Sequence, residues 1–254
     1  RRQRQMCIRD RVDAEAGPQP TTVKLWYAAE DLRLARAVFV NRLSRSEASF
    51  ATTMDLLQER FGTRLGAVTL PWGEGEDFDG IIDLVRMKAR HCNGTEAVES
   101  EIPEEYRAQA EEAHDHLCEL VAEADDELMM KYLEGEELTK GEIKAALRKA
   151  TISNEIVPVV CGSSYKNRGV QKLLDAIVDY MPAPTDVAAI KGTNPETGEE
   201  EDRTSSDDQP FSALAFKIMA DPFVGKLAFF RVYSGTMNSG SYVLNATKNK
   251  KERV

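Results

Sequence analysis

The chain has 254 residues, of which 42% are hydrophobic, enough for one large domain or two smaller ones with packed cores. Its 33 Lys and Arg against 43 Asp and Glu give a net charge of -10, which excludes a protein that coats nucleic acid with its general surface. No apolar run approaches the roughly 18 residues that a membrane helix needs, so we expect no membrane partner.

The first eleven residues are rich in Arg and Gln and follow neither a helical nor a strand period. They resemble translated adapter sequence, so we interpret 1–11 as a non-native tail outside the fold; a disordered basic tail is the alternative. The segment has charge but no apolar core, and it is therefore not expected to be a signal peptide.

The next segment predicts a helix over 21–37 that leads into a short buried strand, Ala37–Val40. A continuous run of β-branched and aromatic residues is typical of a parallel strand covered on both faces. This strand ends on Asn41-Arg42-Leu43-Ser44. A second helix is expected over 50–61, with Gly62 as its C-cap.

The pattern then changes to short strands and long helices. Residues 67–70 and 80–85 predict strands, separated by the Gly- and Pro-bearing turn 71–79. Apolar residues at spacings of three and four predict one long helix from Pro103 to Leu128. Thr139-Lys140-Gly141-Glu142 is a capping box and predicts the start of a further helix.

A strand, turn and helix follow once more. Residues 156–160 predict a strand that ends on Cys161-Gly162-Ser163-Ser164, and 170–181 predicts the helix behind it. Ligands of open parallel sheets bind at the carboxyl ends of the strands, where this turn and the turn Asn41–Ser44 both fall. We therefore expect the two turns to form one binding edge.

The remainder predicts a different architecture. Residues 185–209 are polar and acidic, as in a linker, with room for one short hairpin. Alternating strands are expected over 211–219, 226–234 and 241–245, separated by turn residues. This pattern is typical of an antiparallel barrel or sandwich.

The two turns have residue types that suit a guanine base. Guanine-nucleotide proteins place an Asn-Lys-x-Asp turn after one strand and a Ser-Ala turn after the other. The Asp carboxylate accepts from two guanine donors at once, the Asn braces the loop, and a backbone N–H of the second turn reaches guanine O6. The candidate base-binding residues are Asn41, Arg42, Leu43, Ser44, Gly162, Ser163 and Ser164.

Several stretches resemble, in the same order, segments of the elongation factor G family of translational GTPases. They are Asp13–Trp26, Phe39–Phe50, Leu70–Ala89, Cys161–Gln171 and 210–254. The resemblance implies an α/β fold: the C-terminal part of a P-loop GTPase parallel sheet with an inserted α+β subdomain, then the first strands of a β-barrel. The implied parts are 12–62 and 154–184 for the GTPase domain, 63–153 for the insert, 185–209 for a linker and 210–254 for the second domain.

Two positions depart from the family pattern. Arg42 replaces a Lys whose stem lies over the base, a mild change. Ser44 replaces the Asp, and a neutral hydroxyl cannot accept from two donors as a carboxylate does. The expected loss is about 2–3 kcal/mol of binding free energy for guanine and much of the selectivity for it. Ser164 stands where the family usually has Ala, which leaves the backbone donor in place.

The chain contains no G-x-x-x-x-G-K-[ST] phosphate loop. The resemblance therefore implies an internal piece of a cytoplasmic GTPase that binds GTP or GDP with Mg²⁺, whose metal ligands and catalytic residues are not in this chain. Phosphoryl transfer depends on positioning the phosphates, so we expect the chain alone to be inactive. The implied function is ribosome-dependent translocation of tRNA and mRNA, with the insert meeting the ribosomal stalk protein and the barrel meeting the small subunit.

Alternatives remain open at this stage. Ser44 is compatible with a nucleotide-defective protein that keeps its ribosome-binding surfaces, and a ribosome-protection or recycling GTPase shares the scaffold. Asn41–Ser44 could also be an ordinary strand-end turn.

Thiols and histidines are the other candidates for sites. The four cysteines, scattered and without a Cys-x-x-Cys pair, suit reduced thiols: Cys7, Cys92, Cys118 and Cys161. Cys161 ends a buried strand with no histidine near it in sequence, which favours a structural thiol over a nucleophile. His114, His116 and Cys118, with His91 and Cys92, fit no standard zinc spacing, so no metal site is expected.

Overall fold

The computed structural model describes residues 7–254 except 63, 94–95, 187–188, 195–196 and 224. The chain divides into two compact units, one ending at Pro182 and one beginning at Ala183, and each is described by itself. Among the described helices, none combines the length and apolar character that crossing a bilayer requires.

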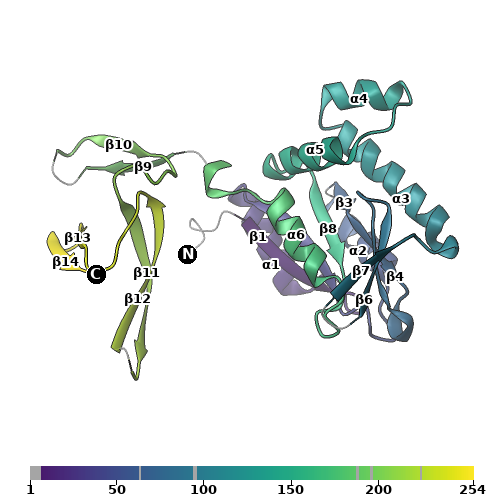
Figure 1. The fold of residues 1–254 in the computed structure, drawn as a ribbon, viewed down its shortest axis with the longest axis horizontal. Coiled ribbons are helices and arrows are strands. Elements are labelled where there is room, and N and C mark those ends of the chain that lie inside the picture. Colours follow the sequence, from purple (N-terminus) through teal and green to yellow (C-terminus); the bar gives the residue numbers. More distant parts are fainter. Residues whose placement is uncertain (1–6, 63, 94–95, 187–188, 195–196, 224) are drawn as a thin grey trace. The chain divides into compact units, whose positions relative to one another are not determined.

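A four-stranded parallel sheet organises the first unit (Figure 1). Its strands are β1 (Cys7–Asp13), β2 (Ala35–Asn41), β8 (Val157–Cys161) and β3 (Leu65–Ala67), in that spatial order. All five residues of β8 and six of the seven in β2 are buried, as expected for strands covered on both faces. Three helices accompany the sheet: α1 (Pro20–Asp31), α2 (Phe50–Phe61) and α6 (Val170–Tyr180).

The N-terminal segment differs from the interpretation of 1–11 as a tail outside the fold. Cys7–Asp13 forms β1, whose backbone pairs with β2 in parallel register, Cys7 with Ala35 and Asp13 with Asn41. Ladder hydrogen bonds use only backbone groups, so a sequence without strand periodicity can still complete a sheet edge. Residues 1–6 lie outside the described part of the chain.

Helix α2 has the predicted bounds, and both of its ends have a physical cause. The Ser49 side chain accepts from the backbone N–H of Thr52, and Gly62 closes the helix in the left-handed conformation at φ 55°. Helix α1 ends at Asp31, earlier than predicted, because Arg33 adopts a positive φ and the N–H of Leu34 turns back to the carbonyl of Ala29.

The segment between β3 and β8 contains an antiparallel sheet and three helices. The sheet has the order β4 (Thr69–Trp72), β5 (Gly80–Asp83), β6 (Lys88–Asn93) and β7 (Glu96–Ser100). The sequence did not indicate β6 and β7, whose residues are mostly polar. A 3-10 turn, η2 (Gly75–Asp77), lies in the connection between β4 and β5.

The three helices of this segment are α3 (Glu104–Ala122), α4 (Asp126–Leu133) and α5 (Lys140–Ile152). The prediction of one helix through Leu128 is wrong, because the Asp125 carboxylate accepts from the N–H of Glu127 and starts α4 as a separate helix. The capping box of α5 is confirmed: Thr139 and Glu142 each accept from the other's backbone N–H.

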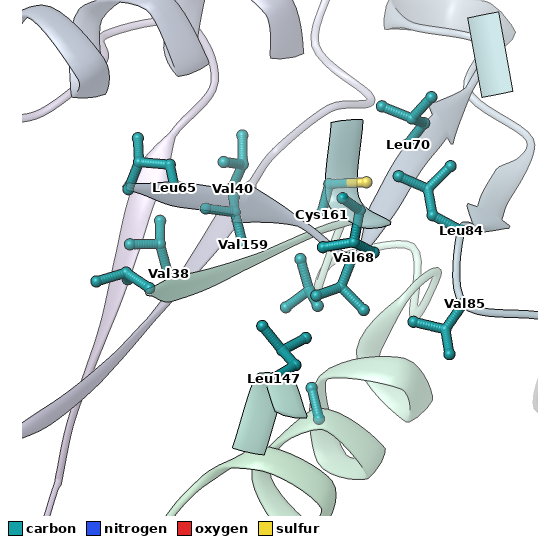
Figure 2. Close-up of a cluster of buried hydrophobic side chains, with 14 of the residues drawn as sticks. Val38, Val40, Leu65, Val68, Leu70, Leu84, Val85, Leu147, Val159 and Cys161 are labelled. Carbon is teal, nitrogen blue, oxygen red and sulfur yellow. The ribbon is translucent and has the colours of Figure 1, made fainter. Parts of the chain in front are cut away.

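The insert and the parallel sheet share one core. Figure 2 shows Val38, Val40 and Val159 of the parallel sheet on one side and Leu70 and Leu84 of the insert on the other, with Cys161 and Val68 between them. All are buried, and they belong to one continuous cluster. The first residues of the predicted insert also include β3, which pairs with β8 in the parallel sheet. The insert is therefore packed as part of the first unit.

The second unit consists of hairpins. A short 3-10 turn, η3 (Pro184–Asp186), precedes the predicted small hairpin, formed by β9 (Ile190–Thr193) and β10 (Glu200–Arg203). The predicted longer strands follow as β11 (Ser212–Asp221) and β12 (Gly225–Ser234), then β13 (Tyr242–Asn245) with β14 (Lys250–Arg253). All pairs are antiparallel, in agreement with the beginning of a β-barrel.

Candidate guanine-base site

The two predicted base-facing turns lie side by side at one edge of the parallel sheet. Strands β2 and β8 are neighbours, with Val40 opposite Cys161, so their carboxyl ends open onto the same place. Asn41 and Ser164 are 123 residues apart in sequence and joined by hydrogen bonds. We call residues 41–44 the first turn and residues 162–164 the second turn.

Asn41 links the first turn to the second. Its Oδ1 accepts from the backbone N–H of Ser164 at 2.9 Å and from the Ser164 hydroxyl at 2.7 Å. The N–H of Leu43, a fully buried residue, donates to the carbonyl of Gly162 at 3.3 Å. This agrees with the expected bracing role of the Asn, which fixes Ser164 of the second turn against the first turn.

Ser44 lies against Ser163, with their hydroxyl oxygens 2.8 Å apart. Ser163 is 1% exposed, while Ser44 is partly exposed. In the Asn-Lys-x-Asp pattern a carboxylate stands at this position. Here the first turn supplies only a neutral hydroxyl, so the place where a guanine edge would sit has no negative charge from residue 44.

Arg42 has a partner that the sequence did not indicate. Its guanidinium Nη1 lies 2.5 Å from Oδ2 of Asp13, the last residue of β1. The Arg42 backbone is in the left-handed region at φ 69°, uncommon for a long side chain. No sequence signal pointed to this pair, because no strand was expected to end at Asp13. Arg45 forms a similar pair with Glu15 at 3.2 Å.

Glycine is required at the start of the second turn. A Cβ on Gly162 would meet the carbonyl oxygen of Arg168 at 2.4 Å, closer than real side chains come. The same carbonyl accepts from the N–H of Ser163 at 2.8 Å, and the N–H of Arg168 donates back to Ser163 at 3.1 Å. The second turn is therefore one side of a tight hairpin that Arg168 closes.

Cys161 is enclosed and lies apart from the two turns' polar surface. Its N–H donates to the Thr69 hydroxyl at 2.9 Å, and that hydroxyl lies 3.3 Å from the sulfur. Complete burial raises the pKa of the Cys161 thiol to about 12. A thiol that stays protonated and covered is a structural residue.

The histidines named in the sequence have other partners. Nδ1 of His114 lies 2.8 Å from the Leu84 carbonyl, and its Nε2 lies 3.5 Å from the Cys118 sulfur. His116 points to Glu119 at 3.8 Å, and His91 to Asp79 at 2.7 Å. The Cys92 side chain lies outside the described residues. Among the described residues, no three His, Cys, Asp or Glu side chains gather as metal ligands would.

This edge has the chemical groups of a binding site for a planar ring. It offers hydroxyls, a carboxamide, backbone groups and a guanidinium, the inventory for holding a planar heterocycle. The seven candidate residues include no carboxylate, so they offer Mg²⁺ none of its preferred charged ligands.

Two family models and a solved structure match the chain. Residues 11–183 match the family model described as "Elongation factor Tu GTP binding domain", and residues 210–254 match that described as "Elongation factor G domain 2". A crystal structure of a protein from Thermus thermophilus is similar, with a TM-score of 0.78 and 30% sequence identity over 96% of this chain. The match covers 34% of that protein, so the present chain spans about a third of its length. The chain therefore belongs to the family of the elongation factor Tu GTP-binding domain, followed by a segment similar to domain 2 of elongation factor G.

Proposed function

We propose that this chain is the base-reading part of a longer GTPase that drives movement of tRNA and mRNA through the ribosome. The observation that carries the proposal is the joined edge, where Asn41 ties the first turn to Ser164 of the second. In this proposal Asn41, Arg42, Leu43 and Ser44 face the guanine of GTP or GDP from one side. Gly162, Ser163 and Ser164 face it from the other.

The remaining roles extend the same proposal. The Mg²⁺ ion and the phosphates are held by parts of the longer protein, since the 254 residues contain no phosphate-loop motif. The insert contacts the ribosomal stalk protein, and the strands after 210 contact the small subunit. In this proposal both contacts are made with the ribosome in the cytoplasm. An acidic chain can make them through local surface patches.

A nucleotide-defective ribosome-binding protein is the second candidate. The uncharged Ser44–Ser163 pair favours it, because the strongest guanine contact of the pattern is missing. The two candidates differ in the upstream sequence: an intact phosphate loop supports the enzyme and a degraded loop supports the binding protein.

The test uses the longer protein, expressed from its complete gene and purified. We expect ribosomes to stimulate its GTP hydrolysis and GTP to support a one-codon advance of mRNA on the ribosome. Replacing Asn41 with Ala should weaken GDP binding, because it releases both bonds to Ser164. Ribosome binding without nucleotide binding or hydrolysis would exclude the enzyme and support the second candidate.

A further inference from the structure

The loop between β4 and β5, residues 73–79, contacts the chain of both base-facing turns although it belongs to the insert. We call it the β4–β5 loop. Its first half lies against the first turn, and its second half lies against the hairpin that carries the second turn. One half of the loop contacts the first turn and the other half contacts the second turn's hairpin. The loop therefore connects the two turns to each other and to the insert.

The β4–β5 loop holds the first turn through its first half. The N–H of Gly75 donates to the carbonyl of Leu43 at 2.8 Å, next to Ser44. The Glu74 carboxylate accepts from the N–H of Phe50 at 2.7 Å, at the N-terminus of α2, where a negative charge is favourable. A Cβ on Gly75 would lie 3.4 Å from the Arg45 carbonyl, so the loop backbone packs directly on the chain just after the first turn.

The second half of the loop holds the second turn through Arg168. The Arg168 guanidinium donates to the carbonyl of Phe78 and lies 3.4 Å from Oδ1 of Asp79. The Arg168 backbone pairs in both directions with Ser163, whose hydroxyl meets Ser44. One side chain thus connects the insert to the hairpin that carries the second turn.

The β4–β5 loop is itself held in one shape. The N–H of Asp79 donates to the Trp72 carbonyl at 2.9 Å, closing the loop, and His91 of β6 lies 2.7 Å from the Asp79 carboxylate. Gly73 has φ 75°, and a Cβ there would meet the Asp77 carbonyl oxygen at 2.1 Å. A loop with these constraints moves with the insert.

We propose that the β4–β5 loop and Arg168 position the two base-facing turns relative to each other, so that the insert controls guanine-nucleotide affinity. The proposal rests on the proposed guanine-binding function. Arg168 is a positioning residue, since its guanidinium contacts the insert and not the base. It affects the base site only through its backbone hydrogen bonds to Ser163. Coupling between two sites is reciprocal, so a partner bound to the insert shifts nucleotide affinity and nucleotide shifts affinity for that partner.

The first test measures hydrogen–deuterium exchange in the 254-residue chain, without nucleotide. Arg168→Gln should speed amide exchange in residues 41–48. These residues do not contact the Arg168 guanidinium and are linked to it only through Ser163 and the β4–β5 loop. The matched control is Arg90→Gln, which removes another guanidinium between the insert and α6, paired with Glu99 and Asp175. Equal exchange of 41–48 in the two variants would overturn the positioning role.

The second test measures fluorescent GDP binding to the longer protein. Arg168→Gln should weaken GDP by about fivefold or more, while Arg90→Gln leaves it unchanged. Arg168→Lys should restore part of the affinity, since it keeps one cationic donor. Unchanged affinity in Arg168→Gln, with a wild type that binds, overturns the inference. A wild type that fails to bind GDP overturns the proposed function instead, and the exchange measurement still decides whether Arg168 positions the first turn.

Discussion

Replacing Ser44 with Asp tests whether this edge reads guanine. The new carboxylate would stand beside the Ser163 hydroxyl, now 2.8 Å from Ser44 Oγ, and could accept from it as well as from the base. Ser44 is partly exposed, so the added charge is not stranded in a dry core. The substitution should therefore be tolerated by the fold.

The expected gain follows from the number of donors on the base. A carboxylate that accepts from guanine N1–H and the exocyclic amino group adds about 2–3 kcal/mol, or about 30- to 150-fold in affinity. Hypoxanthine lacks the amino group and keeps one of the two bonds, so its gain should be about half in free energy. The ratio of IDP to GDP dissociation constants should rise about tenfold.

The assay is competition of GDP and IDP against a fluorescent guanine nucleotide on the longer protein. Ser44→Asn is the matched control, because it has nearly the same shape as the Asp variant without the charge and should not reproduce the gain. Equal tightening of GDP and IDP by Ser44→Asp would refute the two-donor contact. So would an equal gain from Ser44→Asn.

Three further outcomes are expected. The 254-residue chain alone should give no saturable signal with fluorescent GDP, and micromolar affinity would contradict the need for a separate phosphate-binding part. Cys161 should resist alkylation at pH 8 in the native chain, as followed by mass spectrometry of its peptide. Its pKa is about 12 in the folded chain against an ordinary 9.0. The thiol therefore stabilises the folded state below pH 9, and this contribution to the free energy of unfolding is lost as the pH rises toward 12. Lys172→Met should destabilise the first unit by about 3 kcal/mol, because it removes the buried ammonium that pairs with the buried Asp83 carboxylate at 2.6 Å. The carboxylate keeps only the backbone N–H groups of Val85 and Arg86 and the Arg86 guanidinium at 4.0 Å. Urea unfolding followed by tryptophan fluorescence reports this unit, and Lys149→Met, which removes an exposed partner of Asp125, should leave the midpoint nearly unchanged.

The sequence predicted best where one local rule decides the structure. Helix α2 was placed correctly because Gly62 ends it, and α5 because Thr139 and Glu142 form a capping box. The adjacency of the first and second turns also followed from sequence, since each ends a strand with the composition of a buried parallel sheet.

The misses at β6, β7 and Arg168 have tertiary causes, and the missed helix break has a local one, the Asp125 N-cap. Strands β6 and β7 are mostly polar, and pairing with β5 rather than residue pattern fixes them. The break at Asp125 separates helices whose apolar spacing runs on without interruption. Arg168 could not be recognised as a link between the insert and the second turn, because its partners at 78–79 lie about ninety residues earlier in the chain.

The pairing of β3 with β8 has a consequence for how the protein is made. The ribosome must synthesise all elements from β4 to α5 before it reaches β8. Until then the edge of β2 that pairs with β8 has no partner, and the apolar side chains of β2 are uncovered. Long-range pairing of this kind is slow compared with local helix formation. The strand that carries the second turn is therefore the last of the four to be synthesised, and β3, whose partner in the sheet is β8, joins the sheet only with it. A nascent chain stalled within the insert would expose the unpaired edge of β2 to other chains, which favours aggregation.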